Sequence, residues 1–320
     1  MSSFRVIKIM KKATGYLTVG VLFGFLFWNI WQNRGEVSKI TWNIKSFDSL
    51  FLILSLSLVY LSNIFSWHLT TRALGVRVSF KDNFRVWMFS NLSRLLPGGI
   101  WQYPSRVYLL SGQGITKKIG VTAVILESAL NLGVGAGVVF LSLAFWKLPG
   151  GFEQFRVLLL FFLVFAFLAM FLMNAKFTAI VVNGIKKITK KEGKILTEIK
   201  LPARWIVPLL LSFFFKFVFI GTALFFLIRL SVPFDISLLP IVIGAFALSW
   251  LLGYVVVFAP GGLGITEVSL ASLLVSYMPF SGAAVIVVVF RILLLAAEAV
   301  FLGISLKISL FFQYPKKSGR

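Results

Sequence analysis

The sequence predicts an all-α integral membrane protein with about six full crossings, two re-entrant hairpins and two halves of inverted topology. Three observations lead to this fold class: an excess of apolar residues, apolar runs long enough to cross a bilayer, and two Pro-Gly-Gly triplets. Of the 320 residues, 59% are hydrophobic and 13% are charged, whereas globular chains average about 25% charged residues. A soluble fold could not bury so much apolar surface, but lipid can solvate it.

Six apolar runs have the length of a membrane-spanning helix. An α-helix rises about 1.5 Å per residue, so about 20 residues cross a hydrocarbon core of about 30 Å. The first run is followed by polar residues and lacks a small-x-small cleavage pattern, so we interpret it as a retained anchor rather than a signal peptide. The expected spans are Gly15–Trp31, Ser49–Leu69, Ile119–Trp146, Val157–Met173, Trp205–Leu230 and Ala283–Phe311.

Two further apolar stretches, Phe84–Leu96 and Leu238–Ala259, end at the Pro-Gly-Gly triplets of residues 97–99 and 260–262. Proline restricts the residue before it and glycine permits irregular backbone, so each triplet ends a helix. Irregular backbone at membrane depth is tolerated where protein buries it or where it lines a watery cavity. We therefore expect two re-entrant hairpins. The alternative is that each triplet is a loop between two ordinary helices.

Basic residues set the expected orientation. The formal net charge is +22, and the densest basic run lies between Lys176 and Arg204. Other basic residues precede the first span, follow the second and end the chain. The positive-inside rule places these segments, and so both termini, in the cytoplasm of a multi-pass protein of the cell membrane. A nucleic-acid-binding surface would also be basic, but no soluble domain presents one, and we expect contact with anionic lipid headgroups instead.

The triplets also indicate an internal repeat. They lie about half a chain apart, and each precedes a long span that carries a charge, Glu127 in one case and Arg291 in the other. Each half then reads span, span, hairpin, span. Because each half crosses an odd number of times, residues 157–320 are inverted relative to residues 1–156. Inverted repeats whose broken helices meet near the midplane are a recurring plan of secondary transporters.

Ionisable residues inside the apolar spans are the next signal. A charged side chain at the centre of a span costs about 2.5–3.5 kcal/mol on insertion scales, so it usually faces inward and is paired. Asn131 follows Glu127 by about one helical turn on the same face. These residues line a polar transport cavity or form structural ion pairs, and the sequence leaves both readings open, as it does a pairing of Glu127 with Arg291. The charged residues are Glu127, Lys216, Arg291 and Glu298.

The triplets carry an argument for anion binding. A helix that begins inside the membrane presents unpaired N–H groups and the positive end of its dipole, which together suit a phosphate. Basic residues flank the first triplet, and a glycine and a glutamate follow the second. The candidate substrate-binding residues are therefore Arg94, Pro97, Gly98, Gly99, Arg106, Glu127, Pro260, Gly261, Gly262, Gly264, Glu267, Arg291 and Glu298.

Catalytic signatures are missing from the sequence. The chain has no cysteine and one histidine, which excludes thiolate and multi-histidine metal sites. It also has no phosphate-binding loop of the Gly-x-x-x-x-Gly-Lys-Ser/Thr type. We therefore expect neither an enzyme nor a cofactor or metal site.

Two segments resemble the signatures of a known family. Leu95 to Gly99, followed by Arg106 and Glu127, and the segment Ala259–Glu267 are similar to motifs of the flippase-like membrane domain of lysyl-phosphatidylglycerol synthases. The likeness covers nearly the whole chain. The sequence departs from the family pattern at two positions that commonly hold arginine in the family, and these are Ser128 and Thr266.

This resemblance implies movement of a phospholipid or a lipid-linked headgroup between leaflets, with anionic membrane lipids as the partners. The chain ends at Arg320, soon after the last expected span, so we expect a stand-alone member without the aminoacyl-transferase domain of the bifunctional relatives. Three alternatives stay open: a membrane-embedded enzyme acting on lipid-linked sugar, a scaffold for a lipid-modifying enzyme, and an ion-coupled carrier of a small anion.

Overall fold

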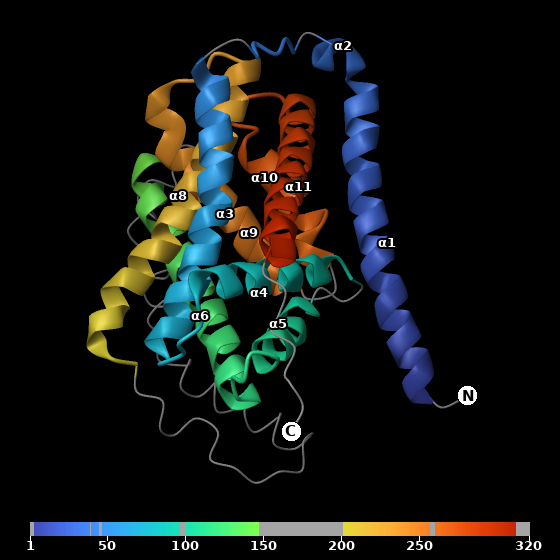
Figure 1. Ribbon diagram of the computed structural model, residues 1–320. Coiled ribbons are helices and arrows are strands. Elements are labelled where there is room, and N and C mark those ends of the chain that lie inside the picture. The colour runs from blue at the N-terminus through green and yellow to red at the C-terminus, as the bar shows by residue number, and fades with distance from the viewer. Residues whose placement is uncertain are drawn as a thin grey trace, which may run out of the picture.

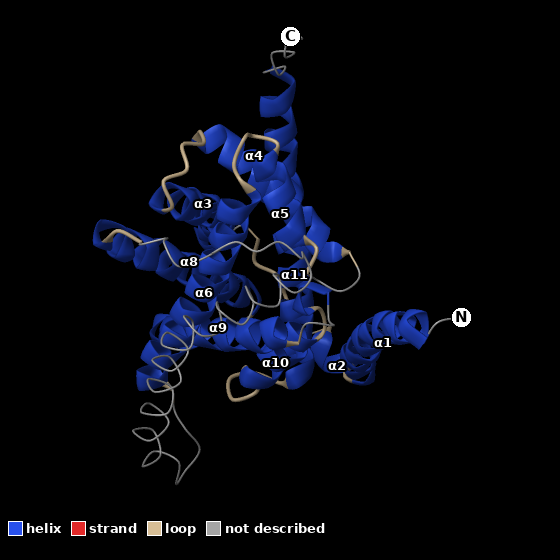
Figure 2. Cartoon of the chain, turned by 90° about the horizontal axis from the view of Figure 1, so that it is seen from below, coloured by secondary structure: helices blue, strands red, loops and turns tan. Residues whose placement is uncertain are grey.

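The computed structural model describes residues 3–38, 40–44, 47–96, 100–146, 201–256 and 260–311, and all regular secondary structure in these ranges is helical (Figures 1 and 2). The all-α fold class is therefore confirmed. The α-helices are α1 (Ser3–Gln32), α2 (Arg34–Val37), α3 (Phe47–Ala73), α4 (Phe80–Leu92), α5 (Gln102–Ser111), α6 (Lys117–Ser142), α8 (Ile206–Ser231), α9 (Leu239–Val255), α10 (Ile265–Leu273) and α11 (Phe280–Phe311).

Five helices of the described part are long and apolar enough to cross a membrane, so the chain is a multi-pass membrane protein. The expected span Val157–Met173 and the first triplet, residues 97–99, lie outside the described residues. The apolar part of α1, Val19–Gln32, is shorter than the five candidates. The number of crossings stays a prediction. The candidates are Phe47–Ala73, Lys117–Phe145, Ala203–Ser231, Ile236–Val255 and Phe280–Ile308.

The second triplet forms a turn between α9 and α10. Gly261 and Gly262 have φ angles of 59° and 70°, a left-handed conformation that glycine adopts without steric cost. α10 packs against α9 after the turn. The rings of Phe234, before α9, and Tyr277, after α10, lie 6.1 Å apart, so this unit ends on the side where it began. The α9 part, expected as one arm of a short hairpin, is itself long enough to cross a membrane, and a re-entrant path through lipid stays a prediction.

The first triplet lies between α4 and α5. The Ser79 side chain caps α4 by accepting a hydrogen bond from the Asp82 N–H at 3.1 Å, which satisfies one of the free amides of the helix start. α4 and α5 pack against each other and lie at the lower end of the molecule in Figure 1, between the end of α3 and the start of α6. This unit therefore occupies the side opposite to the loops that begin and end the α9–α10 unit.

The helices form a bundle in which α8 packs along α3 and also contacts α6 and α9. α1 stands at the edge of the bundle in both ribbon views (Figures 1 and 2). Its Leu22 side chain would meet a Cβ at Gly264, next to the second triplet. The interior is filled by aromatic and aliphatic side chains such as Phe213, Phe217 and Phe225. The bundle therefore buries three clusters of apolar side chains in its described part.

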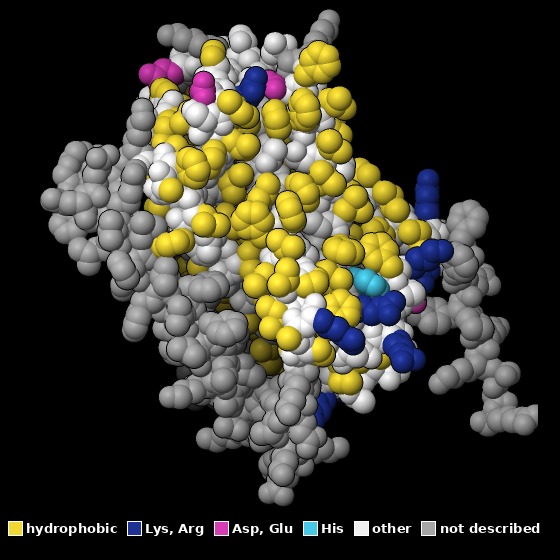
Figure 3. Space-filling view, turned by 90° about the vertical axis from the view of Figure 1, so that its left-hand side faces the viewer, with side chains coloured by type: hydrophobic (Ala, Val, Ile, Leu, Met, Phe, Trp, Pro, Cys, Tyr) yellow, Lys and Arg dark blue, Asp and Glu magenta, His cyan; other side chains and the backbone are white. Residues whose placement is uncertain are grey.

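The outer surface has the charge pattern of a membrane protein. In the described part of the face shown in Figure 3, apolar side chains predominate, most of the Lys and Arg side chains lie in its lower half, and most of the Asp and Glu side chains lie at its upper end. Exposed Arg72 in the last turn of α3, Arg77 in the loop after it and Lys81 in the first turn of α4 are basic, whereas exposed Glu36 of α2 and Asp235, before α9, are acidic. α1 begins and α11 ends on the basic side in Figure 1. The cytoplasmic location of this basic side stays a prediction of the positive-inside rule.

Candidate polar cavity

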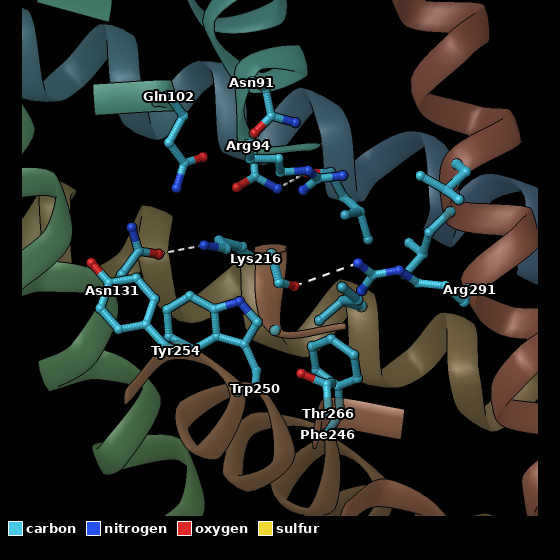
Figure 4. Close-up of a pocket in the computed structure, with 18 of the residues that line it drawn as sticks. Asn91, Arg94, Gln102, Asn131, Lys216, Phe246, Trp250, Tyr254, Thr266 and Arg291 are labelled. Atoms are coloured by element: carbon cyan, nitrogen blue, oxygen red, sulfur yellow. Dashed lines mark hydrogen bonds between the residues drawn. The ribbon is translucent and has the colours of Figure 1, made fainter. Parts of the chain in front are cut away.

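We call α4 and α5 with the triplet between them the first Pro-Gly-Gly unit, and α9 and α10 with theirs the second. A cavity of about 310 Å³ lies inside the bundle, between these two units. In Figure 4, residues of α4 and α5 approach it from one side and residues of α9 and α10 from the other, with Lys216 of α8 between them. The long helices α6 and α11 complete the wall. Of the residues predicted from the sequence, the ones that line the cavity are Arg94, Arg106, Glu127, Gly261, Gly262, Glu267 and Arg291.

The first charged pair joins α5 to α6. Arg106 Nη1 forms an ion pair with Glu127 Oε2, and Arg106 Nε donates a hydrogen bond to Ser90 Oγ at 2.9 Å. The guanidinium lies 4.8 Å from the ring centre of Trp67, a cation–π distance. Arg106 is 3% exposed and Glu127 is 7% exposed. Two buried charges are tolerated here because they pair with each other and Arg106 also donates the hydrogen bond to Ser90.

The second charged pair joins α10 to α11. Arg291 Nη1 lies 3.2 Å from Glu267 Oε1, and Arg291 Nη2 donates to the Gly261 carbonyl at 3.4 Å. The other carboxylate oxygen of Glu267 accepts a hydrogen bond from the Gly264 N–H at 2.6 Å. A carboxylate is favourable at a helix N-terminus because the helix dipole is positive there. The start of α10, which the sequence suggested for a phosphate, thus already holds an anion of the protein itself.

A third pair joins the short turn that follows α4 to α11. Arg94, in the short 3₁₀ turn just before the first triplet, forms an ion pair with Glu298. The second oxygen of Glu298 accepts a hydrogen bond from the Asn91 side chain at 2.7 Å. Glu298 is buried and lies behind Arg94, which lines the cavity. Glu298 therefore holds Arg94 in place and does not itself line the cavity.

Lys216 is the fourth cation of the cavity. Its amine donates a hydrogen bond to the side-chain oxygen of Asn131 on α6 and lies 5.2 Å from the ring centre of Trp250 and 5.3 Å from that of Phe217. The sequence marked Lys216 as a charge within an apolar span but did not place it among the candidate site residues. Its position inside a long apolar helix was the signal that could have placed it there.

Two other polar features of the cavity were less clearly indicated by the sequence. Asn131 lies one turn after Glu127, and this spacing placed both on one face of α6 before the structure was known. Tyr103 and Tyr254 share a hydrogen bond of 2.8 Å between their hydroxyl oxygens across the cavity. Nothing in the sequence indicated this contact, because it joins α5 to α9.

The remaining candidate residues are not among the described residues that line the cavity. Pro97, Gly98 and Gly99 lie outside the described residues. Pro260 belongs to the turn before α10, and Gly264 precedes the first residue of α10. Glu127 does not pair with Arg291, a possibility that the sequence left open, since each has a partner in its own half. The two departures from the family pattern, Ser128 and Thr266, both line the cavity.

Comparison with known proteins agrees with this architecture. A family model described as the lysylphosphatidylglycerol synthase TM region matches residues 14–301. The match includes both Pro-Gly-Gly units and every ion pair of the cavity. No curated protein matches the chain. Within the described ranges, no group of three His, Cys, Asp or Glu residues is placed to hold a metal ion.

Proposed function

The chain belongs to the family of the lysylphosphatidylglycerol synthase TM region, and from this premise we propose that it moves a phospholipid or a lipid-linked headgroup between the leaflets of the cell membrane. The family supports a role that involves membrane lipid. The translocation itself is our proposal, as are a transport rather than an enzymatic activity and cytoplasmic termini.

The observation that carries the proposal is a charged cavity inside a bundle whose outside is apolar. The cavity of about 310 Å³ has a size typical of small-molecule sites. A headgroup that crosses the hydrocarbon core needs polar groups to replace its water, because each unsatisfied polar group costs several kcal/mol there. Arginines, glutamates, tyrosine hydroxyls and amide side chains supply such groups. The acyl chains stay in lipid while the headgroup passes.

The two Pro-Gly-Gly units support the same proposal. The second unit brings irregular backbone of Gly261 and Gly262 to the cavity wall, and the first contributes Arg94 and Arg106 from either side of its triplet. Broken helices that face each other near the midplane form the substrate site of several transporter folds. In this proposal, a lipid phosphate binds between the two units. Movement of one unit relative to the other then opens the cavity to each leaflet in turn.

A lipid-translocation assay tests this function. The purified protein is reconstituted in liposomes with fluorescent phospholipids of different headgroup, and the label in the outer leaflet is quenched chemically. We expect protein-dependent loss of the protected label, and we expect Arg291→Ala to reduce that loss by at least about tenfold, as removal of about 1.4 kcal/mol of substrate binding would. Wild-type protein that is folded but moves no tested lipid would contradict the proposal.

The matched control is Lys117→Met. Lys117 is an exposed residue at the start of α6 and lies outside the polar cavity. This variant changes the charge of the protein without touching the site, so its translocation rate should equal that of the wild type. An equal loss in both variants would indicate a general effect of charge at the membrane surface.

A further inference from the structure

The charges that face the polar cavity do not balance among the described residues. Each of the three arginines has its own glutamate: Arg94 has Glu298, Arg106 has Glu127 and Arg291 has Glu267. Lys216 has no carboxylate within ion-pair distance in the described part of the chain. Its polar contact is the neutral side-chain oxygen of Asn131. Among the described residues, the cavity with Glu298 behind it therefore has four cations and three carboxylates, and each carboxylate already forms an ion pair with an arginine.

Lys216 also lies deep in the bundle. It is the eleventh residue of α8, so it lies about 15 Å from the start of that helix, or half the thickness of a hydrocarbon core of about 30 Å. A lone charge at this depth is unfavourable, and ionisable residues found there face a cavity or a partner. Aromatic rings of Trp250 and Phe217 stabilise the ammonium by cation–π contact, but they do not neutralise it.

The amine has capacity for a further ligand. An ammonium group has three N–H donors, and the oxygen of Asn131 accepts from this group. An anion with several oxygens supplies both the missing negative charge and acceptors for the remaining N–H donors of Lys216.

We propose that Lys216 is the anion-binding residue of the cavity and that it selects a phosphate group carrying one net negative charge. This inference rests on the proposed function and names the substrate class of that site. The three Arg–Glu pairs shape the wall and are already neutral, so they add little preference for charge. A phosphodiester headgroup with one negative charge, bound at Lys216, makes the charged cavity neutral as a whole. A zwitterionic headgroup brings a second cation that has no free carboxylate to meet.

A purely structural role for Lys216 makes a different prediction. In that case, the lysine would only bridge α8 to α6 through Asn131, and its removal would destabilise the protein without changing which headgroup binds. The two roles separate in a binding experiment in which the charge of the ligand is varied. Dihexanoyl phosphatidylglycerol carries one negative charge, dihexanoyl phosphatidylcholine is zwitterionic, and inorganic phosphate provides the anion without a lipid.

The experiment measures the affinity of each of these three probes for the full chain in a non-ionic detergent by isothermal titration calorimetry. The wild type should bind the phosphatidylglycerol at least about tenfold more tightly than the phosphatidylcholine. Lys216→Met should lower affinity for the phosphatidylglycerol by at least about tenfold and change that for the phosphatidylcholine less than twofold. Lys216→Arg should retain the preference. Lys216-dependent binding of inorganic phosphate at matching affinity would assign the site to the free anion, and its absence to the lipid headgroup.

A second variant keeps the test independent of folding. Asn131→Asp preserves the shape of the side chain and gives Lys216 a carboxylate partner, so it should abolish the preference for the anionic lipid while the lysine stays in place. Lys117→Met is again the control and should bind all probes as the wild type does. A preference that persists in folded Lys216→Met or in Asn131→Asp would overturn the inference.

The translocation assay separates this inference from the proposed function. Translocation by the wild type with the same headgroup preference in Lys216→Met would overturn the role of Lys216 and leave transport standing. Lys216-dependent binding without translocation of any lipid would support the anion site and contradict transport.

Discussion

Each Pro-Gly-Gly unit forms an arginine–glutamate ion pair with the long helix that follows it, but the two units contribute residues of opposite charge. In the first unit, the short helix α5 carries the arginine and the long helix α6 carries the glutamate, as the pair Arg106–Glu127. In the second unit, the short helix α10 carries the glutamate and the long helix α11 carries the arginine, as the pair Glu267–Arg291. Both pairs face the same cavity. In both units, an ion pair joins the short helix to the long helix that follows it. The two units differ in which of the two helices carries the arginine.

The position of each residue along its short helix explains the difference. Glu267 lies in the first turn of α10, where its carboxylate accepts the Gly264 N–H and is favoured by the helix dipole. Arg106 lies in the middle of α5, away from that helix start, and stacks over Trp67 and Trp87. An arginine in place of Glu267 would oppose the dipole and leave the amide without an acceptor. The short helix therefore carries a glutamate where the side chain lies beside the free N–H groups of the helix start, and an arginine where it does not.

The two pairs also differ in burial. The side chains of Arg106 and Glu127 are 3% and 10% exposed, whereas those of Arg291 and Glu267 are 18% and 2% exposed. The first pair is closed on both sides and the second is open at its arginine. We therefore expect the first pair to contribute more to stability. Substitutions in the two pairs and at the glycines beside them test that expectation.

The largest effect is expected for Arg106→Met. This change leaves the buried carboxylate of Glu127 without a charged partner, and breaking a buried pair in this way typically costs about 3–5 kcal/mol. Unfolding of the detergent-solubilised protein, followed by circular dichroism, measures the loss. The double variant Arg106→Met with Glu127→Gln removes the isolated charge and should recover part of it. A double variant that is no more stable than Arg106→Met would show that packing over Trp67, not charge, dominates this site.

A smaller effect is expected for Arg291→Met. Glu267 keeps its hydrogen bond from the Gly264 N–H, so its carboxylate stays partly satisfied and the loss should be about 2 kcal/mol, within the range for a buried group that loses one partner. The same unfolding measurement gives the value. A loss as large as that of Arg106→Met would mean that capping of α10 does not compensate for the missing arginine, and would remove the distinction between the two units.

The smallest effects concern the glycines beside each unit. A Cβ at Gly253 would lie 2.2 Å from Thr266 Oγ1 and 3.3 Å from Gly262 Cα, so Gly253→Ala forces the turn away from α9 and should cost about 1–2 kcal/mol. A Cβ at Gly120 of the first unit would meet the Val107 side chain at 3.3 Å, and a small shift relieves this contact.

Gly120→Ala is the matched comparison and should change stability by less than about 0.5 kcal/mol, since a helical alanine offsets the crowding. Thermal melting of both variants in the same detergent ranks them. Equal costs would show that the second unit is no more tightly packed than the first.

Much of the fold could be predicted from the sequence, and so could several of the residues that line the cavity. Five of the six apolar runs lie in described residues and form helices there, since twenty apolar residues in succession have few alternatives in lipid. The cost of an ionisable group in such a run also singled out Glu127, Arg291 and Glu298, and the structure places each in an ion pair at the cavity wall or behind it. Short-range patterns were sufficient for these conclusions.

Pairing between helices could not be predicted in this way. The repeat suggested Glu127 with Arg291, yet each has a nearer partner on the helix before it. Ion pairs depend on distances of a few ångströms between helices, and sequence spacing fixes only positions along one helix. The role of Glu267 at the start of α10 is likewise a matter of backbone geometry, because it requires the turn at Gly261 and Gly262 to deliver the Gly264 N–H.

By itself, the sequence determined that this chain is a helical membrane protein, where its helices break and which charges lie within them. These follow from transfer free energies and backbone preferences, which act locally along the chain. Only the tertiary structure decided which charge meets which, and that each arginine of the cavity has a glutamate while Lys216 has an amide. The charge balance of the cavity depends on residues from several helices, and the cavity forms only when these helices pack.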